Sequence, residues 1–461
     1  MAVSSEEAPL LATATATAHI RVLTHAKPSA PGGSSGGSDG KETQAAAKQR
    51  ELQSSTNSWL WTLTLLTSLL LAACTRAAHQ RGKGAARVQL QPQQQELTPF
   101  EQQLYGCRTF KSQAVPYINT SASLSVLDTH TAEQRRQAEN FTAAVAACSD
   151  FACLRQANQL PRAPGQFRFP HFFVIGFPKC ATTSIYCHLI QHPQVQYAKE
   201  KESHILQNKC GRQLANCSLE VQREYLVEIL NLAEVAQAQM TKAAFDGSTH
   251  YVMEGEWLAQ QVAQELPWVK MVVSLREPIS QSLAMHLHNL SHNRTASCWD
   301  ENERRVYACL VDALEEEKRA RYGPKLAQWM AAYPRERLHI LQYEALVSKQ
   351  LMGGVLGGLK GFLEVDPHLP SDTLPLTNWK HMRGNPDAVG RYWNMTRTEY
   401  EHVVELARRN TYEVIKLLGQ HGHADRDGKV GWMRNWDRVW QSNLKDNCEE
   451  GPQGNCKIVV S

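Results

Sequence analysis

Apolar positions after residue 166 alternate between short continuous runs and longer periodic stretches. The short runs 172–175, 268–278 and 337–346 predict buried strands. Helical patterns lie between and around them, at about 182 onward, 219–240, 254–266, 279–290 and 301–332. This alternation predicts an α/β fold, with a parallel sheet flanked by helices and ligands bound at the carboxyl ends of its strands.

The first part of the chain lacks this pattern. Residues 1–57 are rich in Ala, Ser, Thr and Gly and predict a disordered tail. Residues 58–75, SWLWTLTLLTSLLLAACT, are uncharged and predict a single membrane-spanning helix. A transit peptide is the alternative, whereas a cleaved signal peptide is disfavoured so far from the N-terminus. Residues 76–165 are rich in Gln and Ala and predict a stem before a globular domain at 166–425 and an extension at 426–461.

Glycosylation sequons favour a lumenal position for the globular part. Basic residues flank the apolar segment on both sides, so the charge rule does not itself favour this orientation. N-x-[ST] sequons occur only after the segment, and they are used only in a secretory lumen. They lie at Asn119, Asn140, Asn216, Asn289, Asn293 and Asn394.

The cysteines favour the same compartment. The chain has 12 of them, and most fall into close pairs that predict local disulfides. The pairs are Cys148 with Cys153, Cys210 with Cys217, Cys298 with Cys309, and Cys448 with Cys456. Cys107 is left for a longer link or for another chain. No Cys/His spacing typical of a zinc site is present, so no metal is predicted.

Composition changes this picture little. The 461 residues are 42% hydrophobic and 20% charged, which is ordinary for a globular protein with polar extensions. The net charge of +4 suits a polyanionic substrate or a nucleotide. No dense tract of Lys and Arg interleaved with aromatic residues is present, which argues against nucleic-acid binding.

The most informative segment is the loop GFPKCATTS after the first predicted strand. A loop before a helix presents backbone N–H groups and a positive helix terminus to one point, where an anion is favoured. Lys179 adds a full charge, and Thr182, Thr183 and Ser184 add hydroxyl donors. The GxxxxGK[ST] pattern of a nucleoside-triphosphate P-loop is absent. The alternative is a structural turn with one exposed lysine.

This segment, extended to GFPKCATTSIYCHLIQHPQV, resembles the 5'-phosphosulfate loop of the Golgi carbohydrate sulfotransferases. That loop usually has the pattern PKxGTT before a helix and an HP turn, and the chondroitin and dermatan 4-sulfate 6-O type, with PKCGTT, is similar. Ala181 stands at the usual glycine, which narrows the available backbone angles. The resemblance implies a P-loop-like sulfotransferase fold over about 167–419 and the donor 3'-phosphoadenosine 5'-phosphosulfate (PAPS). It also implies that the phosphosulfate contacts Lys179, Cys180, Ala181, Thr182, Thr183 and Ser184.

The second predicted strand ends in LREPISQSLAMHLHN, which resembles the family's 3'-phosphate motif. Its arginine is Arg276, and a guanidinium donates a planar pair of bonds to a phosphate. Ala284 replaces the motif's serine eight residues further on, so Ser280 or Ser282 would have to supply the hydroxyl. A surface ion pair of Arg276 with Glu277 or another acid is the alternative.

Two later segments resemble further parts of the nucleotide site. In RARYGPKLAQWMAAY the family has an arginine or a tyrosine near the 3'-phosphate, which makes Arg319, Arg321 and Tyr322 candidates. In NWKHMRGNP the resemblance implies a basic loop that closes over the nucleotide, with Lys380 and Arg383.

The segment KESHIL resembles the family's KEPHFF, whose glutamate is the proposed general base. The resemblance implies that Glu202 is the base and that Lys201 orients it or assists the sulfuryl group. A carboxylate suits this role where burial raises its pKa toward neutrality. Lys199 and Glu200 repeat the pair two residues earlier, which leaves the register open, and alternating charges also occur on solvated edges.

The segment DGSTHY resembles the family's acceptor-side (E/D)xS motif. Asp246, Ser248 and His250 are therefore candidates for contacting the acceptor or the nucleotide. His204 and His250 are alternative bases, although a lone histidine is more often structural.

Together these resemblances imply a single-pass Golgi membrane protein whose lumenal domain moves a sulfuryl group from PAPS to a hydroxyl or amine of a glycan or proteoglycan. Lys179 would stabilise the leaving phosphate. No metal is implied, and a homodimer is compatible with the sequence. Three alternatives stay open: a tyrosylprotein or small-molecule sulfotransferase, a nucleoside or sugar kinase, and a non-catalytic glycan-binding protein, to which Ala181 and Ala284 would point.

Overall fold

A computed structural model describes residues 129–291, 298, 305–315, 320–369, 393–423 and 428–458. Several predictions lie outside these residues, namely the tail 1–57, the apolar segment 58–75, and Asn119, Asn293, Arg319, Lys380 and Arg383. Among the described helices, none combines the length and the apolar character that crossing a membrane requires.

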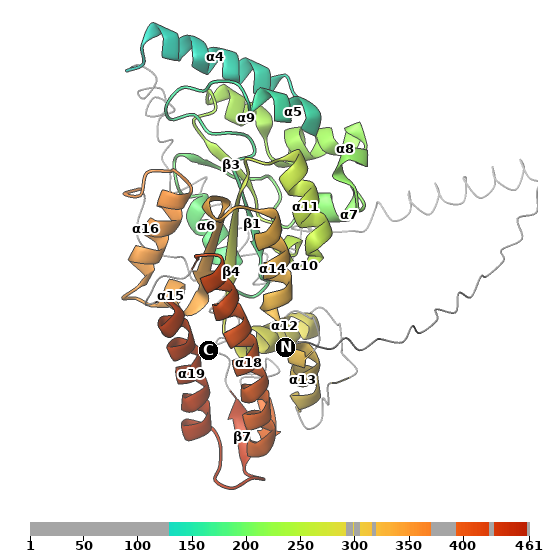
Figure 1. Cartoon of the computed structure of the whole chain (residues 1–461), viewed down its shortest axis with the longest axis vertical. Coiled ribbons are helices and arrows are strands. Elements are labelled where there is room, and N and C mark those ends of the chain that lie inside the picture. The colour runs from blue at the N-terminus through green and yellow to red at the C-terminus, as the bar shows by residue number, and fades with distance from the viewer. Residues whose placement is uncertain are drawn as a thin grey trace, which may run out of the picture. The chain divides into compact units, whose positions relative to one another are not determined.

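A five-stranded sheet forms the centre of the described part (Figure 1). Its strands are β1 (Phe172–Gly176), β2 (Val195–Gln196), β3 (Ala243–Asp246), β4 (Lys270–Leu275) and β5 (Leu338–Gln342). They lie in the order β2-β3-β1-β4-β5, and every neighbouring pair is parallel. The predicted α/β fold with a parallel sheet is confirmed, whereas β2 and β3 were not predicted as strands.

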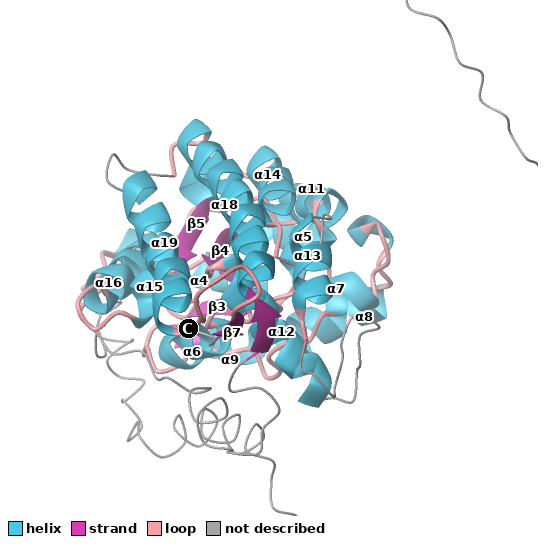
Figure 2. Cartoon of the chain, turned by 90° about the horizontal axis from the view of Figure 1, so that it is seen from below, coloured by secondary structure: helices cyan, strands magenta, loops and turns pink. Residues whose placement is uncertain are grey.

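The side chains of β1 point alternately to the two faces of the sheet, as strand side chains do. Phe173 and Ile175 pack in the core of one face, and Phe172 and Val174 pack in the core of the other. The sheet is thus covered by helices on both sides (Figure 2). On the first face these include α11 (Glu256–Glu265) and α14 (Tyr322–Ala332), and on the second α6 (Thr182–Leu189) and α16 (Met352–Phe362).

The connections after the strands decide where a ligand site lies. β1 leads into α6 on one face, whereas β3 and β4 lead into α10 (Tyr251–Glu254) and α12 (Pro278–Ser291), whose apolar side chains join the core of the opposite face. The chain therefore leaves the carboxyl ends of adjacent strands in opposite directions. Open α/β sheets bind their ligands at such a point.

Two predicted helices are interrupted. The stretch 219–240 is broken where Asn231 adopts a left-handed conformation with a φ of 61°, and the stretch 254–266 is broken at Gly255, with a φ of 63°. Both conformations end a right-handed helix. The remaining described elements around the sheet are α7 (Ile205–Asn208), η1 (Leu214–Asn216), α8 (Leu219–Arg223), η2 (Glu224–Ile229), α9 (Leu232–Gln237), α13 (Tyr307–Glu315), η3 (Arg335–Arg337) and α15 (Tyr343–Val347).

Two helices before β1 pack with the sheet. They are α4 (Ala132–Ala146) and α5 (Phe151–Ala157). Their Phe141 and Phe151 side chains are fully buried in the same core as Phe173. These residues fall in the predicted stem, yet they belong to the packed unit.

Two long helices follow the sheet in the chain, α18 (Arg397–Gln420) and α19 (Gly428–Asp446), and they lie side by side (Figure 1). An antiparallel pair of strands, β6 (Trp393–Thr396) and β7 (Asn455–Ile458), connects the start of α18 with the residues after α19.

The four local disulfides predicted from the cysteine spacing are all present. They join Cys148 to Cys153, Cys210 to Cys217, Cys298 to Cys309, and Cys448 to Cys456. Cys187 is disulfide-bonded as well, which was not predicted. Cys180 is a buried free thiol.

Candidate functional site

The loop between β1 and α6 carries the residues that match the phosphosulfate motif. Lys179 and Ala181 both have a positive φ, of 65° and 60°, so the backbone turns sharply before α6 begins at Thr182. Gly176 precedes the loop, where a Cβ atom would lie 2.8 Å from the carbonyl oxygen of Thr249. Glycine is required there, and this close approach brings the loop against the segment after β3.

The first turn of α6 faces this loop. The first N–H groups of a helix lack acceptors within the helix and carry partial positive charge. Thr182 and Ser184 are buried and Thr183 is half-buried. The hydroxyl residues predicted to bind an oxyanion therefore form a single helical turn.

Lys179 lies among other cations. Burial, together with the positive charges of Lys201 and Arg276, lowers the pKa of Lys179 to about 8, while Glu202 acts in the opposite direction. Of these four groups, three are cations and one is a carboxylate, so positive charge prevails immediately around Lys179. An oxyanion here would favour the charged form of the lysine and raise its pKa again.

Arg276 follows β4 and lies beside the loop. Its Nη1 donates to the carbonyl oxygen of Lys179 at 3.2 Å. Its guanidinium lies over the ring of Tyr343, with Cζ 4.3 Å from the ring centroid. Its own carbonyl oxygen accepts a hydrogen bond from the Tyr322 hydroxyl at 2.9 Å. The first two contacts fix the guanidinium next to the loop after β1, and the third holds the backbone of Arg276.

Glu277, the acid next to Arg276, caps α12. It is buried, and its carboxylate accepts the N–H groups of Ile279 and Ser280, each at 2.7 Å. It also accepts the indole N–H of Trp440 at 2.7 Å. A carboxylate in this position satisfies donors at the helix start that have no partner within the helix. The surface ion pair between Arg276 and Glu277, considered as an alternative, is therefore replaced by a buried helix cap.

The C-terminal helix α19 supports this region. Trp436 donates from Nε1 to Glu344 at 2.7 Å, and Glu344 accepts the backbone N–H of Glu277 at 2.8 Å. Burial raises the pKa of Glu344 to about 7. Trp436 and Trp440, both fully buried, thus hold the acids that follow β5 and β4. For this segment the sequence predicted only an extension at 426–461.

The segment after β2 brings Glu202 and Lys201 to the same site. The Lys201 ammonium bonds Oε1 of Glu202. Thr249 donates its N–H to Oε2 at 2.8 Å and its hydroxyl to Oε1 at 2.9 Å. Glu202 has a positive φ of 65°. That conformation is costly for a residue with a Cβ and is typical of functional sites.

The pKa of Glu202 differs from the expectation. Burial raises it, but the charge of Lys201 and the hydrogen bonds from Lys201 and Thr249 prevail, so the pKa lies below the ordinary value. The carboxylate is therefore ionised at neutral pH and able to accept a proton. The other pair with this pattern, Lys199 and Glu200, is exposed.

Two histidines lie beside Glu202. His204 Nε2 is 3.4 Å from Oε2 of Glu202, and the rings of His204 and His250 meet edge to face with centroids 5.1 Å apart. Ligand atoms of these three residues lie within 4.8 Å of one another. Two imidazoles and a carboxylate suit a divalent transition metal, although the Lys201 ammonium on the same carboxylate opposes a cation. Among the described residues this is the group that can hold a metal.

Asp246 is enclosed by protein. It is 0% exposed, and burial raises its pKa. The buried Ser248, which donates its hydroxyl to Asp246, accepts the backbone N–H of His204 at 3.1 Å. Asp246 and Ser248 thus hold the loop after β2, and their described contacts are with other protein groups. The donors to Asp246 are the hydroxyls of Tyr225, Ser248 and Tyr251, at 2.8, 2.6 and 3.0 Å.

The other predicted nucleotide contacts lie less directly at the site. Tyr322 is fully buried and reaches Arg276 only through its carbonyl oxygen, so it supports the arginine. Ser282 is half-buried on α12, whereas Ser280 is buried. Arg321 forms an ion pair with an acid of α18.

Two features of the site were not predicted. The first is Thr249, which donates both its N–H and its hydroxyl to Glu202. The available signal in the sequence was its position between Ser248 and His250, in a segment that already held predicted site residues. Trp436 and Trp440 hold the acids beside Arg276. Their spacing of four residues, which puts both on one face of a helix, was the available signal.

Comparisons with known proteins gave short matches. No protein-family model matches the chain. It is 45% identical over 62 residues to carbohydrate sulfotransferase 15 of Homo sapiens, covering 12% of this chain and 11% of that protein. It is 44% identical over 62 residues to the protein of the same name from Rattus norvegicus, with the same coverage. Over 35 residues it is 51% identical to that from Mus musculus, covering 8% of this chain and 6% of that protein. The match thus spans about a tenth of the length of these relatives.

Solved structures of sulfotransferases were also found. The sulfotransferase from Alicyclobacillus acidocaldarius is 16% identical, with a TM-score of 0.37, and the match covers 57% of this chain and 98% of that chain. The sulfotransferase domain from the curacin biosynthetic pathway is 16% identical, with a TM-score of 0.29, over 44% of this chain and 80% of that chain. TM-scores this low do not establish a shared fold. The sequence matches, however, confirm the predicted resemblance of this chain to the carbohydrate sulfotransferase family.

Proposed function

We propose that this chain is a PAPS-dependent sulfotransferase that modifies a hydroxyl or amine of a glycan. One observation carries the proposal: Lys179, Lys201 and Arg276 converge at the carboxyl ends of the strands, beside the ionised Glu202. Burial and the positive charges of Lys201 and Arg276 lower the pKa of Lys179. This cluster of three cations fits a donor with two phosphate positions. The neighbouring carboxylate fits a proton acceptor.

In this proposal PAPS supplies the sulfuryl group, and the chain's residues bind and polarise it. Lys179 and the N–H groups of α6 bind the phosphosulfate and stabilise the charge that develops on the leaving phosphate. Arg276 binds the second phosphate through its planar guanidinium. The Lys201 ammonium lies at the same point and adds positive charge.

Glu202 is the proposed base. Its carboxylate takes the proton of the acceptor hydroxyl as the new bond to sulfur forms. Lys201 and Thr249 orient the carboxylate and keep it ionised. Thr249 links the two proposed parts of the site: it bonds Glu202, and Gly176, just before the proposed phosphosulfate loop, packs against it.

The proposed setting is the Golgi lumen, with residues 58–75 as the anchor. The four local disulfides support an oxidising compartment. Asn140 and Asn216 are exposed and so are suited to glycosylation, whereas Asn289 and Asn394 are half-buried. The acceptor is proposed to be a glycan because the curated relatives are carbohydrate sulfotransferases.

A kinase is the rival that shares the loop chemistry. It requires acids that hold Mg²⁺ beside the phosphates. Glu202 is bonded to Lys201, and Glu277 caps α12 with its buried carboxylate. These bonds favour the sulfotransferase over the kinase.

Nucleotide-dependent thermal stabilisation of the full chain tests the proposal. We expect 3'-phosphoadenosine 5'-phosphate to raise Tm more than ADP or ATP with Mg²⁺, and Lys179→Ala to abolish that rise. Stronger stabilisation by ATP with Mg²⁺ would favour the kinase. A folded protein that ignores all three nucleotides would favour a glycan-binding protein.

A further inference from the structure

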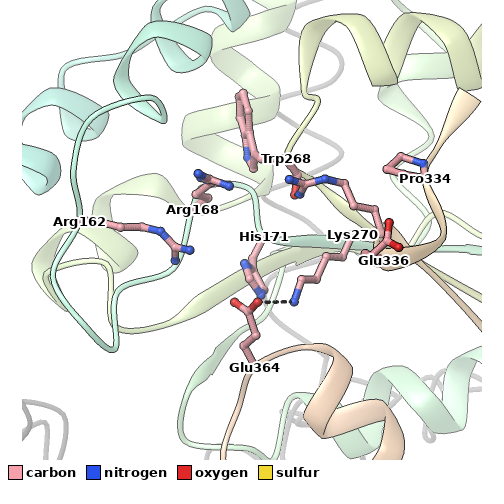
Figure 3. A pocket seen from close by; sticks show the side chains of 9 residues that line it. Arg162, Arg168, His171, Trp268, Lys270, Pro334, Glu336 and Glu364 are labelled. Carbon is pink, nitrogen blue, oxygen red and sulfur yellow. Dashed lines mark hydrogen bonds and ion pairs between the residues drawn. The ribbon is translucent and has the colours of Figure 1, made fainter.

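A pocket lies at the edge of the sheet opposite to Lys179. His171 directly precedes β1, Lys270 begins β4, and Arg337 directly precedes β5. The amino ends of parallel strands share one edge, so these residues lie at the far end of the sheet from Lys179. They line a pocket of about 400 Å³ (Figure 3), a size at which pockets take small ligands.

Positive charge dominates this pocket. Four cationic side chains and two carboxylates line it, which gives a charge of 4 − 2 = +2. Burial lowers the pKa of His171 to about 4, so His171 is neutral at physiological pH. The cations are Arg162, Arg168, Lys270 and Arg337, and the carboxylates are Glu336 and Glu364.

The ion pairing inside the pocket is incomplete. Glu364 pairs with Lys270 at 2.9 Å, as the dashed line in Figure 3 marks. Arg162 donates from Nη1 to the carbonyl oxygen of Gln166 at 2.6 Å, and Arg337 donates from Nη1 to that of Trp268. These bonds hold the two guanidinium groups in place without neutralising their charge.

Arg168 is the least satisfied of the four cations. Its Nε is buried and has no hydrogen-bond partner within the described part of the chain. Burial lowers the pKa of Arg168, and so do the nearby charges of Arg162 and Arg337. Figure 3 shows the guanidinium groups of Arg162 and Arg168 on the same side of the pocket. Like charges held together in this way favour an anion between them.

We propose that this pocket binds a sulfate or carboxylate group of an acidic glycan. A strand of five residues is roughly 17 Å long, so a nucleotide held by Lys179 would not reach this edge. A ligand of this pocket is therefore a separate molecule or a distant part of a long one. Pro334, Glu336 and Glu364 are exposed at its rim, which leaves it open to a polymer. The choice of a glycan rests on the proposed function, whereas the anion site itself does not.

Binding of a fluorescent chondroitin sulfate octasaccharide to the full chain, followed by anisotropy, tests the proposal. Arg168→Gln is expected to raise Kd about tenfold, since it removes a charged donor to the anion. The matched control is Arg409→Gln, on the exposed face of α18, which should leave Kd unchanged. Desulfated chondroitin separates sulfate from carboxylate recognition, and neutral dextran should not bind. Equal Kd values for Arg168→Gln and the wild type would overturn the proposal.

A second measurement separates this site from the proposed donor site. Arg168→Gln should bind 3'-phosphoadenosine 5'-phosphate with the wild-type Kd. The distinguishing result is a wild-type protein that binds the glycan in an Arg168-dependent way without binding the nucleotide. That result would support the anion pocket and contradict the proposed sulfotransferase activity. If Arg168→Gln does not fold, Arg162→Gln replaces it, since Arg162 is a half-buried residue of the same pocket. A raised Kd for the glycan would again support the proposal, and an unchanged Kd would overturn it.

Discussion

Arg276 donates from Nη1 to the backbone carbonyl of Lys179 at 3.2 Å, across 97 positions of sequence. The bond joins the end of β4 to the loop after β1. The two segments that resemble the 5'-phosphosulfate and 3'-phosphate motifs are therefore parts of one site. Neither segment alone indicates that the other lies beside it, so this contact is independent support for the resemblance.

Affinity for the nucleotide should depend on pH through Lys179. In the free protein its pKa is about 8, and an anion favours the charged form. Above pH 8 the Lys179 ammonium of the free protein loses its proton. Binding of the anionic nucleotide then requires that a proton be taken up again, which weakens the apparent affinity. We expect Kd for 3'-phosphoadenosine 5'-phosphate to rise by up to about tenfold per pH unit above pH 8. Titration calorimetry between pH 7 and 10 measures this slope.

Lys179→Arg is the matched control for that slope. Arginine keeps its charge throughout this range, so its Kd should vary little with pH even where binding is weaker. A slope that persists in Lys179→Arg would assign the titration to another group.

The pH dependence of kcat should separate the candidate bases. The pKa of Glu202 lies below its ordinary value, so this carboxylate stays ionised between pH 7 and 5. If Glu202 is the base, kcat should therefore not fall over this range. A histidine base would make kcat fall below about pH 6.5. Glu202→Gln should lower kcat by roughly 10²- to 10⁴-fold and leave the Kd of the nucleotide nearly unchanged. A near-normal kcat in Glu202→Gln, with a large loss in His250→Ala, would assign the base to the histidine.

Ala181→Gly should stabilise the protein. Ala181 has a φ of 60° and a ψ of 18°, a left-handed conformation that glycine adopts more readily. We expect the free energy of unfolding to rise by about 1 kcal/mol. Ala263→Gly, in the middle of α11, is the control and should lower it by a similar amount. Denaturant unfolding measures both, and a loss of stability in Ala181→Gly would contradict the loop conformation.

Trp440→Phe should weaken the support of Arg276. It removes the N–H that bonds the buried Glu277 at 2.7 Å. Losing a donor to a buried carboxylate costs about 1–3 kcal/mol of folding free energy. Because Glu277 follows Arg276 directly, the nucleotide should also bind more weakly. Trp432→Phe, on the same helix, is the control, since no hydrogen bond of its ring nitrogen is described. Equal effects of the two substitutions would contradict the proposed support of Arg276 by the bond from Trp440 to Glu277.

Only strands with a long apolar run were predicted from the sequence, because such a run indicates a strand that is buried on both faces of a sheet. β1, β4 and β5 were predicted because they have five or six residues each. β2 has two residues and β3 has four, AAFD, so neither run stands out. β3 is placed by pairing with β1, and β2 by pairing with β3, and no local sequence pattern indicates either pairing.

The candidate site was predictable where one segment carries the chemistry. Lys179, Arg276 and Glu202 each lie in a segment with its own recognisable pattern. Thr249 and Trp440 act only through a carboxylate distant in sequence, so their roles depend on the tertiary fold. The low pKa of Glu202 depends likewise on the bonds that Lys201 and Thr249 make to it.

Transfer of radioactive sulfur from labelled PAPS to a panel of glycans tests the central claim most directly. The account predicts label in at least one glycan with the wild-type chain, no detectable transfer with Lys179→Ala, and strongly reduced transfer with Glu202→Gln. Label that persists in Lys179→Ala would contradict it. So would a folded wild-type chain that binds 3'-phosphoadenosine 5'-phosphate yet labels none of the glycans and instead labels tyrosine peptides or small phenols.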